Sequence, residues 1–565
     1  MDSPGSFVYD ERGGGSMPQI DFGFDAADPA NWEVVKGFSG IRHYQRFVKN
    51  TYKQAKIDFD WQANDEFNLG FGANIRKYTF DTSFYERNND LLNPTLKEAG
   101  ATTASVSRKI NFGQGLSVPD GTMSSFIVPS IQAFDNLFDF TCNCVNKWGD
   151  WRLTNKRNGG RENFGVEEVD TGFYFQADWN SELFGRPFRG NAGTRVAITD
   201  VTSTGSTTAG RPIVGTNKYT DFLPSVNVVY EPIENLLVRV SASKVMARPL
   251  LGNLAPTLTA ISVPNSSTAT SGATLTVGNP KLQPFRSTNL DASVEWYFAP
   301  GGLLSVAAFQ KEIDSFPQTI FFTGPLSRFA DAETIAAILA QFTPGSPQAN
   351  YITSGYDFQA RQFADAPGGW LRGIEASFQM DFTFLPGLLK NFGAQVNYTH
   401  IDSELNYILD PGTATVPRTT GKGPFLGVSP DAINATLYYE SKPFRARVSV
   451  AHRKGYSTSY PIAAGSCSPG IIPNPTPLTP AQVNGNNVPG GPCTGPLIND
   501  FVYSRSTTNV DASMSFNFTR WVSLTLEGLN LTNQTSDRYA YEGQNAVTQY
   551  ASSGRIFRAG VRFRF

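Results

Sequence analysis

Histidines are the residues most often used for general acid-base chemistry and metal binding, and this chain has few of them. The three, His43, His400 and His452, are far apart in the sequence, and none has a cysteine near it at metal-ligand spacing. No Ser/His/Asp order, nucleophile elbow or HExxH helix is present. We therefore expect no enzyme, no catalytic residue, no cofactor and no metal, and interpret the histidines as structural.

The four cysteines fall into two pairs along the chain. Cys467 and Cys493 lie in one Pro-, Gly- and Asn-rich stretch, residues 455–505, and an even total suits an oxidising compartment. We therefore predict a disulfide between them, which contributes roughly 3 to 4 kcal/mol in the chain-entropy model. Only one residue separates Cys142 from Cys144, so a C-x-C disulfide, a metal contact and two free thiols all stay open.

Two tryptophans and a neighbouring arginine are candidates for binding a ligand. Trp148 and Trp151 offer aromatic faces to sugars or cyclic molecules, and Arg152 offers charge to an anionic one. The alternative is that the tryptophans pack their own segment against itself or mark a membrane interface.

An acidic set, Glu167, Glu168 and Asp170, is the other charged cluster of interest. It could bind a cation, although a solvated strand start is the more ordinary interpretation. Over the whole chain the charges nearly cancel, with 47 basic and 49 acidic residues. This balance argues against nucleic acid as a partner.

The elements that position these residues are indicated most clearly by residues 290–298, which alternate in polarity. Leu290, Ala292, Val294, Trp296 and Phe298 share one face, and Asp291, Ser293, Glu295 and Tyr297 share the other. Such a pattern predicts a strand with one apolar and one polar side. Residues 299–302, Ala-Pro-Gly-Gly, then reverse the chain, and Leu304 and Val306 resume the alternation. We interpret the whole as a membrane-crossing hairpin.

Similar hairpins recur along the chain, joined alternately by short turns and by long irregular connections. The segments concerned are residues 54–80, 165–200, 221–245, 369–404, 433–454 and 508–530. The connections 82–165 and 455–505 are long, and residues 331–342 within another have a weakly helical pattern. The last segment, 554–565, places apolar residues on one face and arginines on the other, and it ends on Phe565. Long external loops and short turns are typical of transmembrane β-barrels.

Composition agrees with a barrel better than with soluble domains or membrane helices. The chain has 565 residues, of which 13% are aromatic and only 17% charged. It contains no run of some 18 apolar residues, as a transmembrane helix requires. A barrel strand needs no such run, because its polar lumen face dilutes the apolar one. The amino-terminal residues 1–15 lack the basic region and apolar core of a secretion signal.

Several motifs resemble those of TonB-dependent outer-membrane receptors, in particular a proteobacterial subfamily often linked to uptake of plant-derived carbohydrates. They are GNPKLQP (278–284), ELFGRPFRGNAGTR (182–195), ASKVMARP (242–249) and RGIE (372–375). Phe285-Arg286 departs from the family pattern, in which an acidic residue followed by Ser is more usual. The terminal Phe565 resembles the carboxy-terminal signature that the barrel assembly machinery recognises.

The resemblance implies an all-β, transmembrane antiparallel β-barrel. Counting crossings gives about fifteen strands of the about 22 in such a receptor. We accordingly expect residues 1–50 to be an extracellular loop or truncated start and residues 51–565 to be the carboxy-terminal part of the barrel, with the plug domain and signal peptide absent. An odd number of strands would pair the first and last in parallel.

The function implied is active import of a scarce ligand, carbohydrate or siderophore-like, across the outer membrane. The alternative is a passive pore or structural barrel. The implied partners are outer-membrane lipid, the barrel assembly machinery, a small-molecule ligand and, only through a plug, the TonB complex.

Overall fold

The computed structural model describes most of the chain. The described residues are 8–10, 18–36, 39–87, 93–113, 118–155, 163–206, 211–265, 267–269, 272–410, 417–460, 501–540 and 546–564. The chain divides into two compact units, each built from separate segments. The first, here the loop unit, is Met1–Lys49, Asp81–Gly165 and Gly205–Pro212; the second, the barrel unit, is Asn50–Phe80, Val166–Thr204 and Ile213–Phe565.

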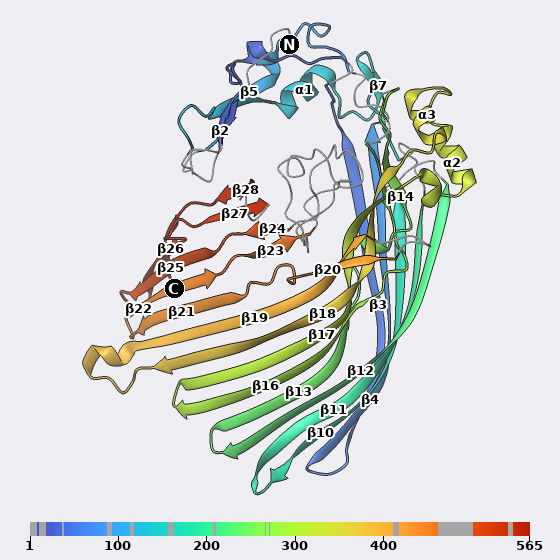
Figure 1. Ribbon diagram of the computed structural model, residues 1–565. Helices are drawn as coiled ribbons and strands as arrows, with labels where there is room; N and C mark the ends of the chain where they lie inside the picture. Colours follow the sequence, from blue (N-terminus) through green and yellow to red (C-terminus); the bar gives the residue numbers. More distant parts are fainter. Residues whose placement is uncertain are drawn as a thin grey trace. The chain divides into compact units, whose positions relative to one another are not determined.

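One sheet of 19 strands dominates the described residues, and four of its members, β9, β14, β15 and β20, are short. The other fifteen are β3 (Tyr44–Gln62), β4 (Phe67–Arg87), β10 (Phe164–Leu183), β11 (Arg186–Ser206), β12 (Pro212–Ile233), β13 (Leu236–Ala247), β16 (Phe285–Ala299), β17 (Gly302–Gly324), β18 (Phe358–Asp381), β19 (Phe392–Asp410), β21 (Asp431–Glu440), β22 (Phe444–Arg453), β25 (Thr507–Asn517), β26 (Val522–Leu529) and β29 (Ile556–Phe563). Figure 1 shows the long strands from β10 to β19 side by side, with short turns at one end.

The long strands form one continuous sheet. Each pairs with the next from β10 to β29, and β4 pairs with β10. The neighbouring long strands run antiparallel, as they do in a transmembrane barrel. The predicted fold, an all-β antiparallel barrel of about fifteen strands, is therefore confirmed.

The remaining described elements are short. The strands are β1 (Val8–Asp10), β2 (Gln19–Asp21), β5 (Ser107–Asn111), β6 (Ser125–Pro129), β7 (Val145–Asn146), β8 (Gly149–Asp150), β9 (Leu153–Thr154), β14 (Leu258–Ser262), β15 (Ala273–Val277), β20 (Thr419–Gly423), β23 (Tyr456–Ser459), β24 (Val502–Ser504), β27 (Thr535–Ala540) and β28 (Ala546–Ser552). The helices are α1 (Ile131–Phe138), α2 (Ala332–Leu339) and α3 (Pro347–Thr353), with 3-10 turns η1 (Pro29–Asn31), η2 (Thr103–Val106), η4 (Leu251–Leu254), η5 (Leu326–Arg328) and η6 (Gly387–Asn391). No helix among the described residues has the length and apolar content needed to cross a membrane.

The hairpin of β16 and β17 has the predicted register and faces. Leu290, Val294 and Trp296 are 53%, 44% and 48% exposed, as expected for side chains that face lipid. The turn falls between Ala299 and Gly302, and Gly301 adopts a φ of +74°, which favours glycine there. On β29, Phe557 and Phe563 are 72% and 60% exposed, but the whole strand is exposed, so exposure does not distinguish its two faces. Phe565 lies outside the described residues, so its role as an assembly signal stays a prediction.

The opposite faces of the strands carry paired charges. The Arg239 guanidinium donates to the Glu295 carboxylate at 2.7 Å, between the neighbouring strands β13 and β16. Arg286 of β16 donates to Asp221 of β12 at 2.5 Å. The interior of a transmembrane barrel is polar, whether it is filled with water or plugged, and it can therefore contain such ion pairs. The polar faces predicted from the alternation therefore line the lumen.

The GNPKLQP motif forms a tight buried crossing inside the barrel unit. The Gly278 N–H donates to the Thr257 carbonyl at 2.6 Å, and a Cβ at Gly278 would stand only 1.9 Å from the Ala255 carbonyl oxygen. The Asn279 side chain donates to the Phe363 carbonyl at 2.9 Å. The glycine is thus required because two backbones cross where no side chain fits.

The second half of the motif ties the same crossing to the barrel wall. Leu282 is fully buried, and its carbonyl accepts from the Asn217 side chain of β12 at 3.1 Å. The Gln283 N–H donates to the Asp365 carboxylate of β18 at 3.1 Å. The motif therefore fastens β12 and β18 to the connection between β13 and β16.

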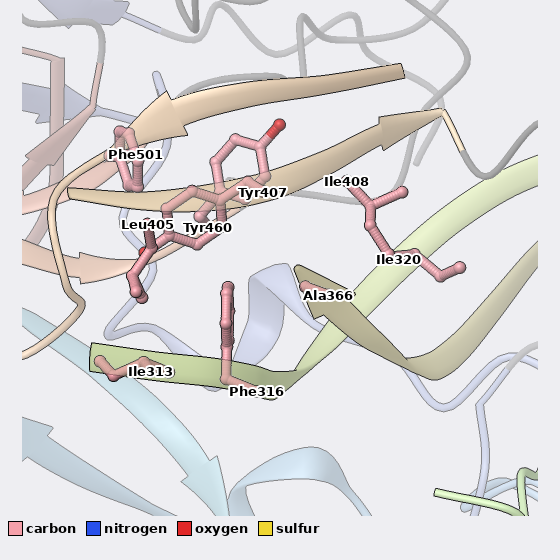
Figure 2. Packing of buried hydrophobic residues seen from close by; sticks show 9 residues of the cluster. All are labelled: Ile313, Phe316, Ile320, Ala366, Leu405, Tyr407, Ile408, Tyr460 and Phe501. Carbon is pink, nitrogen blue, oxygen red and sulfur yellow. The ribbon is translucent and has the colours of Figure 1, made fainter. Parts of the chain in front are cut away.

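A second cluster of buried residues lies where β17, β18 and β19 approach the segments around Tyr460 and Phe501. Its members are Ile313, Phe316, Ile320, Ala366, Leu405, Tyr407, Ile408, Tyr460 and Phe501, and Figure 2 shows their side chains gathering between these elements. The Tyr460 and Phe501 rings lie 5.0 Å apart, centre to centre, and Tyr407 packs on both. Because aromatic pairs at such distances attract each other, the cluster holds Tyr460 close to Phe501.

Candidate ligand site

The loop unit has a hydrophobic core of its own. The buried members are Leu96, Val106, Phe138, Phe140 and Trp151. Helix α1, which supplies Phe138, begins where the Ser130 hydroxyl accepts from the Ala133 N–H and ends at Asp139 in the left-handed region. A core with capped elements gives a loop region a defined shape instead of an ensemble of conformations.

Arg87, at the end of β4, organises the polar side of this core. Its guanidinium donates to the Ile41 carbonyl and to the Asn93 side chain, each at 2.8 Å. Asn93 in turn donates to the Ser39 carbonyl at 2.8 Å. The guanidinium also lies 4.0 Å from the centre of the Trp151 ring, a cation–π contact in a desolvated place. Arg87 therefore joins the amino-terminal segment to the long connection between β4 and β10.

A largely apolar cavity of about 430 Å³ lies in this unit. Its apolar lining includes Trp32, Ile41, Val106, Ile127, Phe134 and Phe140. The size lies within the range of small-molecule sites. Part of the lining, Val106 and Phe140, also belongs to the hydrophobic core, so the cavity is formed before any ligand arrives.

The hydroxyl groups of the lining are mostly engaged within the protein. Ser39 accepts from the Val35 N–H at 2.9 Å, and Thr103 donates to the Trp32 carbonyl at 2.7 Å. The Ser107 hydroxyl is buried and has no hydrogen-bond partner. The charged members of the lining, Glu33 and Arg42, are exposed to solvent.

A family model described as the β-barrel of TonB dependent receptor-like proteins matches residues 4–533. The chain belongs to this family. TonB-dependent receptors are outer-membrane barrels that transport and do not catalyse, which agrees with the expected location and with the expectation that the chain is not an enzyme.

Solved structures of TonB-dependent receptors also resemble the chain. The copper transporter OprC has 12% sequence identity and a TM-score of 0.48, over 92% of this chain and 58% of that one. The FrpB iron transporter from Neisseria meningitidis (F3-3 variant) has 13% identity and a TM-score of 0.45, over 92% and 55%. The ferric yersiniabactin uptake receptor FyuA from Yersinia pestis has 11% identity and a TM-score of 0.44, over 93% and 56%. The chain thus spans less than two thirds of the length of these receptors. A search of curated proteins found no match.

The three residues predicted to bind ligand occupy different environments in this receptor. Trp151 is fully buried, and its indole N–H donates to the Asn146 side chain at 2.9 Å. Trp148 is half-buried and meets Phe138 edge to face. Arg152 is exposed and bound to Asp150 through two hydrogen bonds, an interaction that lowers the pKa of the Asp150 carboxyl to about 2. A ligand role for the three stays a prediction, and the described contacts of Trp151 are those of a core residue.

The cysteine pairs have different outcomes. Cys142 and Cys144 form a disulfide, the first of the three states left open for them. Their Cα atoms are 5.2 Å apart, within the usual range for bridged cysteines. Cys467 and Cys493 lie outside the described residues, so their pairing stays a prediction.

The acidic set is divided by the alternation of β10. Glu167 points to one face and pairs with Lys77 at 2.6 Å. Glu168 and Asp170 point to the other face and are buried, where Arg248 lies 2.8 Å from the Asp170 carboxylate. The set is therefore neither one cation site nor a solvated strand start, because its members pair with different basic residues.

The histidines do not meet one another. His400 lies 2.8 Å from the Asp431 carboxylate, and His452 lies 2.8 Å from the Thr508 hydroxyl. The ring of His43 packs edge to face on Phe140 in the loop unit. Each has a structural contact, as expected.

The sequence did not point to the residues that line the cavity. Trp32 and Ile41 belong to a segment expected to be a loop or truncated start, and Ile127 and Phe134 to a stretch expected to be irregular. The local signals were apolar residues beside N-cap residues such as Ser130 and Thr102. Without periodicity, such signals do not reveal which distant segments pack together.

Proposed function

We propose that the chain is the barrel of an active importer that captures a scarce small molecule and passes it across the outer membrane with energy delivered through TonB. In this proposal the antiparallel sheet of long strands, with exposed apolar side chains such as Leu290 and Val294 on one face, forms the path through the membrane. The observation that most favours capture of a small molecule is the preformed cavity of about 430 Å³ in the loop unit.

Coupling to TonB requires a plug domain in this proposal. In our proposal the plug is encoded outside these 565 residues, and the fifteen long strands are part of a receptor barrel of about 22. Further partners in this proposal are outer-membrane lipid and the barrel assembly machinery. The ligand class is siderophore-like or carbohydrate, and no nucleic acid is involved.

The proposal is tested by uptake in cells that carry or lack the gene at its own locus. Accumulation of ⁵⁵Fe-labelled siderophores and of ¹⁴C-labelled oligosaccharides is measured with and without a protonophore. We expect deletion to lower the uptake of one ligand class, and the protonophore to abolish that same uptake. Uptake that depends on the gene but ignores the protonophore would instead establish a passive pore, and equal uptake by both strains would refute an import function for these ligands.

A further inference from the structure

The chemistry of the cavity in the loop unit narrows the class of ligand. Of its lining hydroxyls, those of Ser39 and Thr103 already hydrogen-bond within the protein, and the Ser107 hydroxyl is the buried one that has no partner. The charged residues Glu33 and Arg42 are exposed. The Ser107 oxygen is shielded from the cavity as well as from bulk water, so the lining offers a ligand apolar and aromatic walls and no free side-chain hydroxyl.

A sugar is a poor match for such a lining. Every hydroxyl that a sugar buries must find a partner in the protein or lose the hydrogen bonds it made with water. Apolar rings have the opposite requirement, since burial against aromatic and aliphatic side chains is what stabilises them. The walls here include Trp32, Phe134 and Phe140, with Ile127 between them in the lining.

We propose that this cavity binds a neutral, ring-containing and largely apolar small molecule, held by contacts with the aromatic and aliphatic walls. Naming that molecule as cargo rests on the proposed function, whereas the binding itself does not. The cavity is held open by the capping of η2, in which the Thr102 and Ser105 side chains bond each other's backbone, and by the Arg87 contacts to Ile41 and Asn93. A rigid site of this kind loses little free energy to reorganisation on binding.

The binding test uses the full chain in lipid nanodiscs and equilibrium dialysis, with empty discs giving the baseline for partition into lipid. The probes are 1-naphthol, which has two fused rings and one hydroxyl, naphthalene, which lacks the hydroxyl, and maltose. We expect saturable binding of both aromatic probes, no tighter for 1-naphthol than for naphthalene, and no saturable binding of maltose. Saturable maltose binding without 1-naphthol binding would overturn the proposal.

A charged residue placed at the cavity tests whether the probe binds there. Ile131 lines the cavity and is 75% exposed at the start of α1, where an acidic residue is compatible with the helix. Ile131→Glu is expected to weaken 1-naphthol binding about tenfold or more because it brings a carboxylate to an apolar site. The matched control is Val145→Glu, which changes another exposed apolar residue of the loop unit, 60% exposed and outside the lining. Equal loss in both variants, or loss in neither, would refute binding in this cavity.

The apolar character of the site is tested by Ser107→Ala. This variant should leave the binding of both aromatic probes unchanged, because the Ser107 oxygen is shielded from the cavity. A loss of 1-naphthol binding with naphthalene binding kept would show that a polar group of the ligand reaches Ser107, and would overturn the assignment. If the pocket variants bind as predicted while cellular uptake is unaffected by gene deletion, the proposed function falls and the cavity assignment stands. If uptake requires the gene but no aromatic probe binds, the cavity assignment falls and the proposed function stands.

Discussion

Buried polar contacts at single residues give the loop unit its shape. Arg87 meets Ile41, Asn93 and the Trp151 ring, and the Trp151 indole donates to Asn146. The aromatic and basic character of this segment could be predicted from the sequence as a ligand-binding feature. Its burial could not, because it depends on residues 45 to 64 positions from Trp151, namely Val106, Leu96 and Arg87, which carry no periodic signal.

Replacing Trp151 by alanine tests whether it is a core residue. Trp151→Ala removes a large, fully buried side chain and the partner of Arg87, so the loop unit should lose about 3 to 5 kcal/mol of stability. Limited proteolysis of the folded chain should then cut faster within residues 81–165. Arg152→Ala is the control, because its ion pair with Asp150 is exposed to solvent and should contribute little to stability. Similar cleavage rates in the two variants would contradict the packing role.

The pairing of Cys467 with Cys493 stays a prediction, and the described residues on the two sides of their loop lie close together. Tyr456 pairs with Ser504 between β23 and β24, and the Tyr460 and Phe501 rings are 5.0 Å apart. Cys467 follows Tyr460 by seven residues, and Cys493 precedes Phe501 by eight. In the sequence, each cysteine is therefore nearly the same number of residues from this pair of neighbouring rings.

Peptide mapping of non-reduced protein isolated from outer membranes should recover one peptide that joins Cys467 to Cys493. Closing this loop should add about 3 to 4 kcal/mol to the stability of the loop's closed form in the chain-entropy model. Two free thiols at these positions in the isolated protein would end the prediction. The same map should also recover the bridge between Cys142 and Cys144 that the structure contains.

At the scale of elements, the alternation of apolar and polar residues predicted the long strands well. The helices and short strands of the loop unit depend on packing between distant segments. The faces of β16 were predicted because lipid and lumen impose a strict period of two on a barrel strand. The helix in residues 331–342 was also foreseen, as α2, with Asp331 accepting from the Thr334 N–H at its start. Helix α1 and the short strands of the loop unit were not, since the stretch was expected to be irregular.

The GNPKLQP motif was predicted from its resemblance to the receptor family, and the structure shows that its glycine lies at a close crossing of two backbones. A methyl group at Gly278 would overlap the Ala255 carbonyl oxygen, so Gly278→Ala should cost about 3 kcal/mol or more and lower the yield of folded barrel. Gly252→Ala is the matched control in the same connection, because the nearest atom to its added Cβ is 3.9 Å away. Heat-modifiable migration on gels measures the folded fraction. Equal folded fractions in the two variants would show that the crossing can relax.

For the whole molecule, the sequence predicted the number of long strands and the barrel class but not the division into two units. The loop unit unites residues 1–49 with two later segments, whereas residues 1–50 were expected to stand alone. Strand β3 also begins at Tyr44, earlier than the predicted start of the barrel at residue 51. Such groupings depend on contacts between distant segments, which local patterns do not encode.

The central claim is that the fifteen long strands form a barrel in the outer membrane. The most direct measurement is density-gradient fractionation of the full chain after export behind a signal peptide. The exposed apolar side chains, such as those of Phe557 and Phe563, should carry the chain into the outer-membrane fraction and make it resist alkaline extraction. A soluble, monomeric protein recovered from the periplasm would contradict the account.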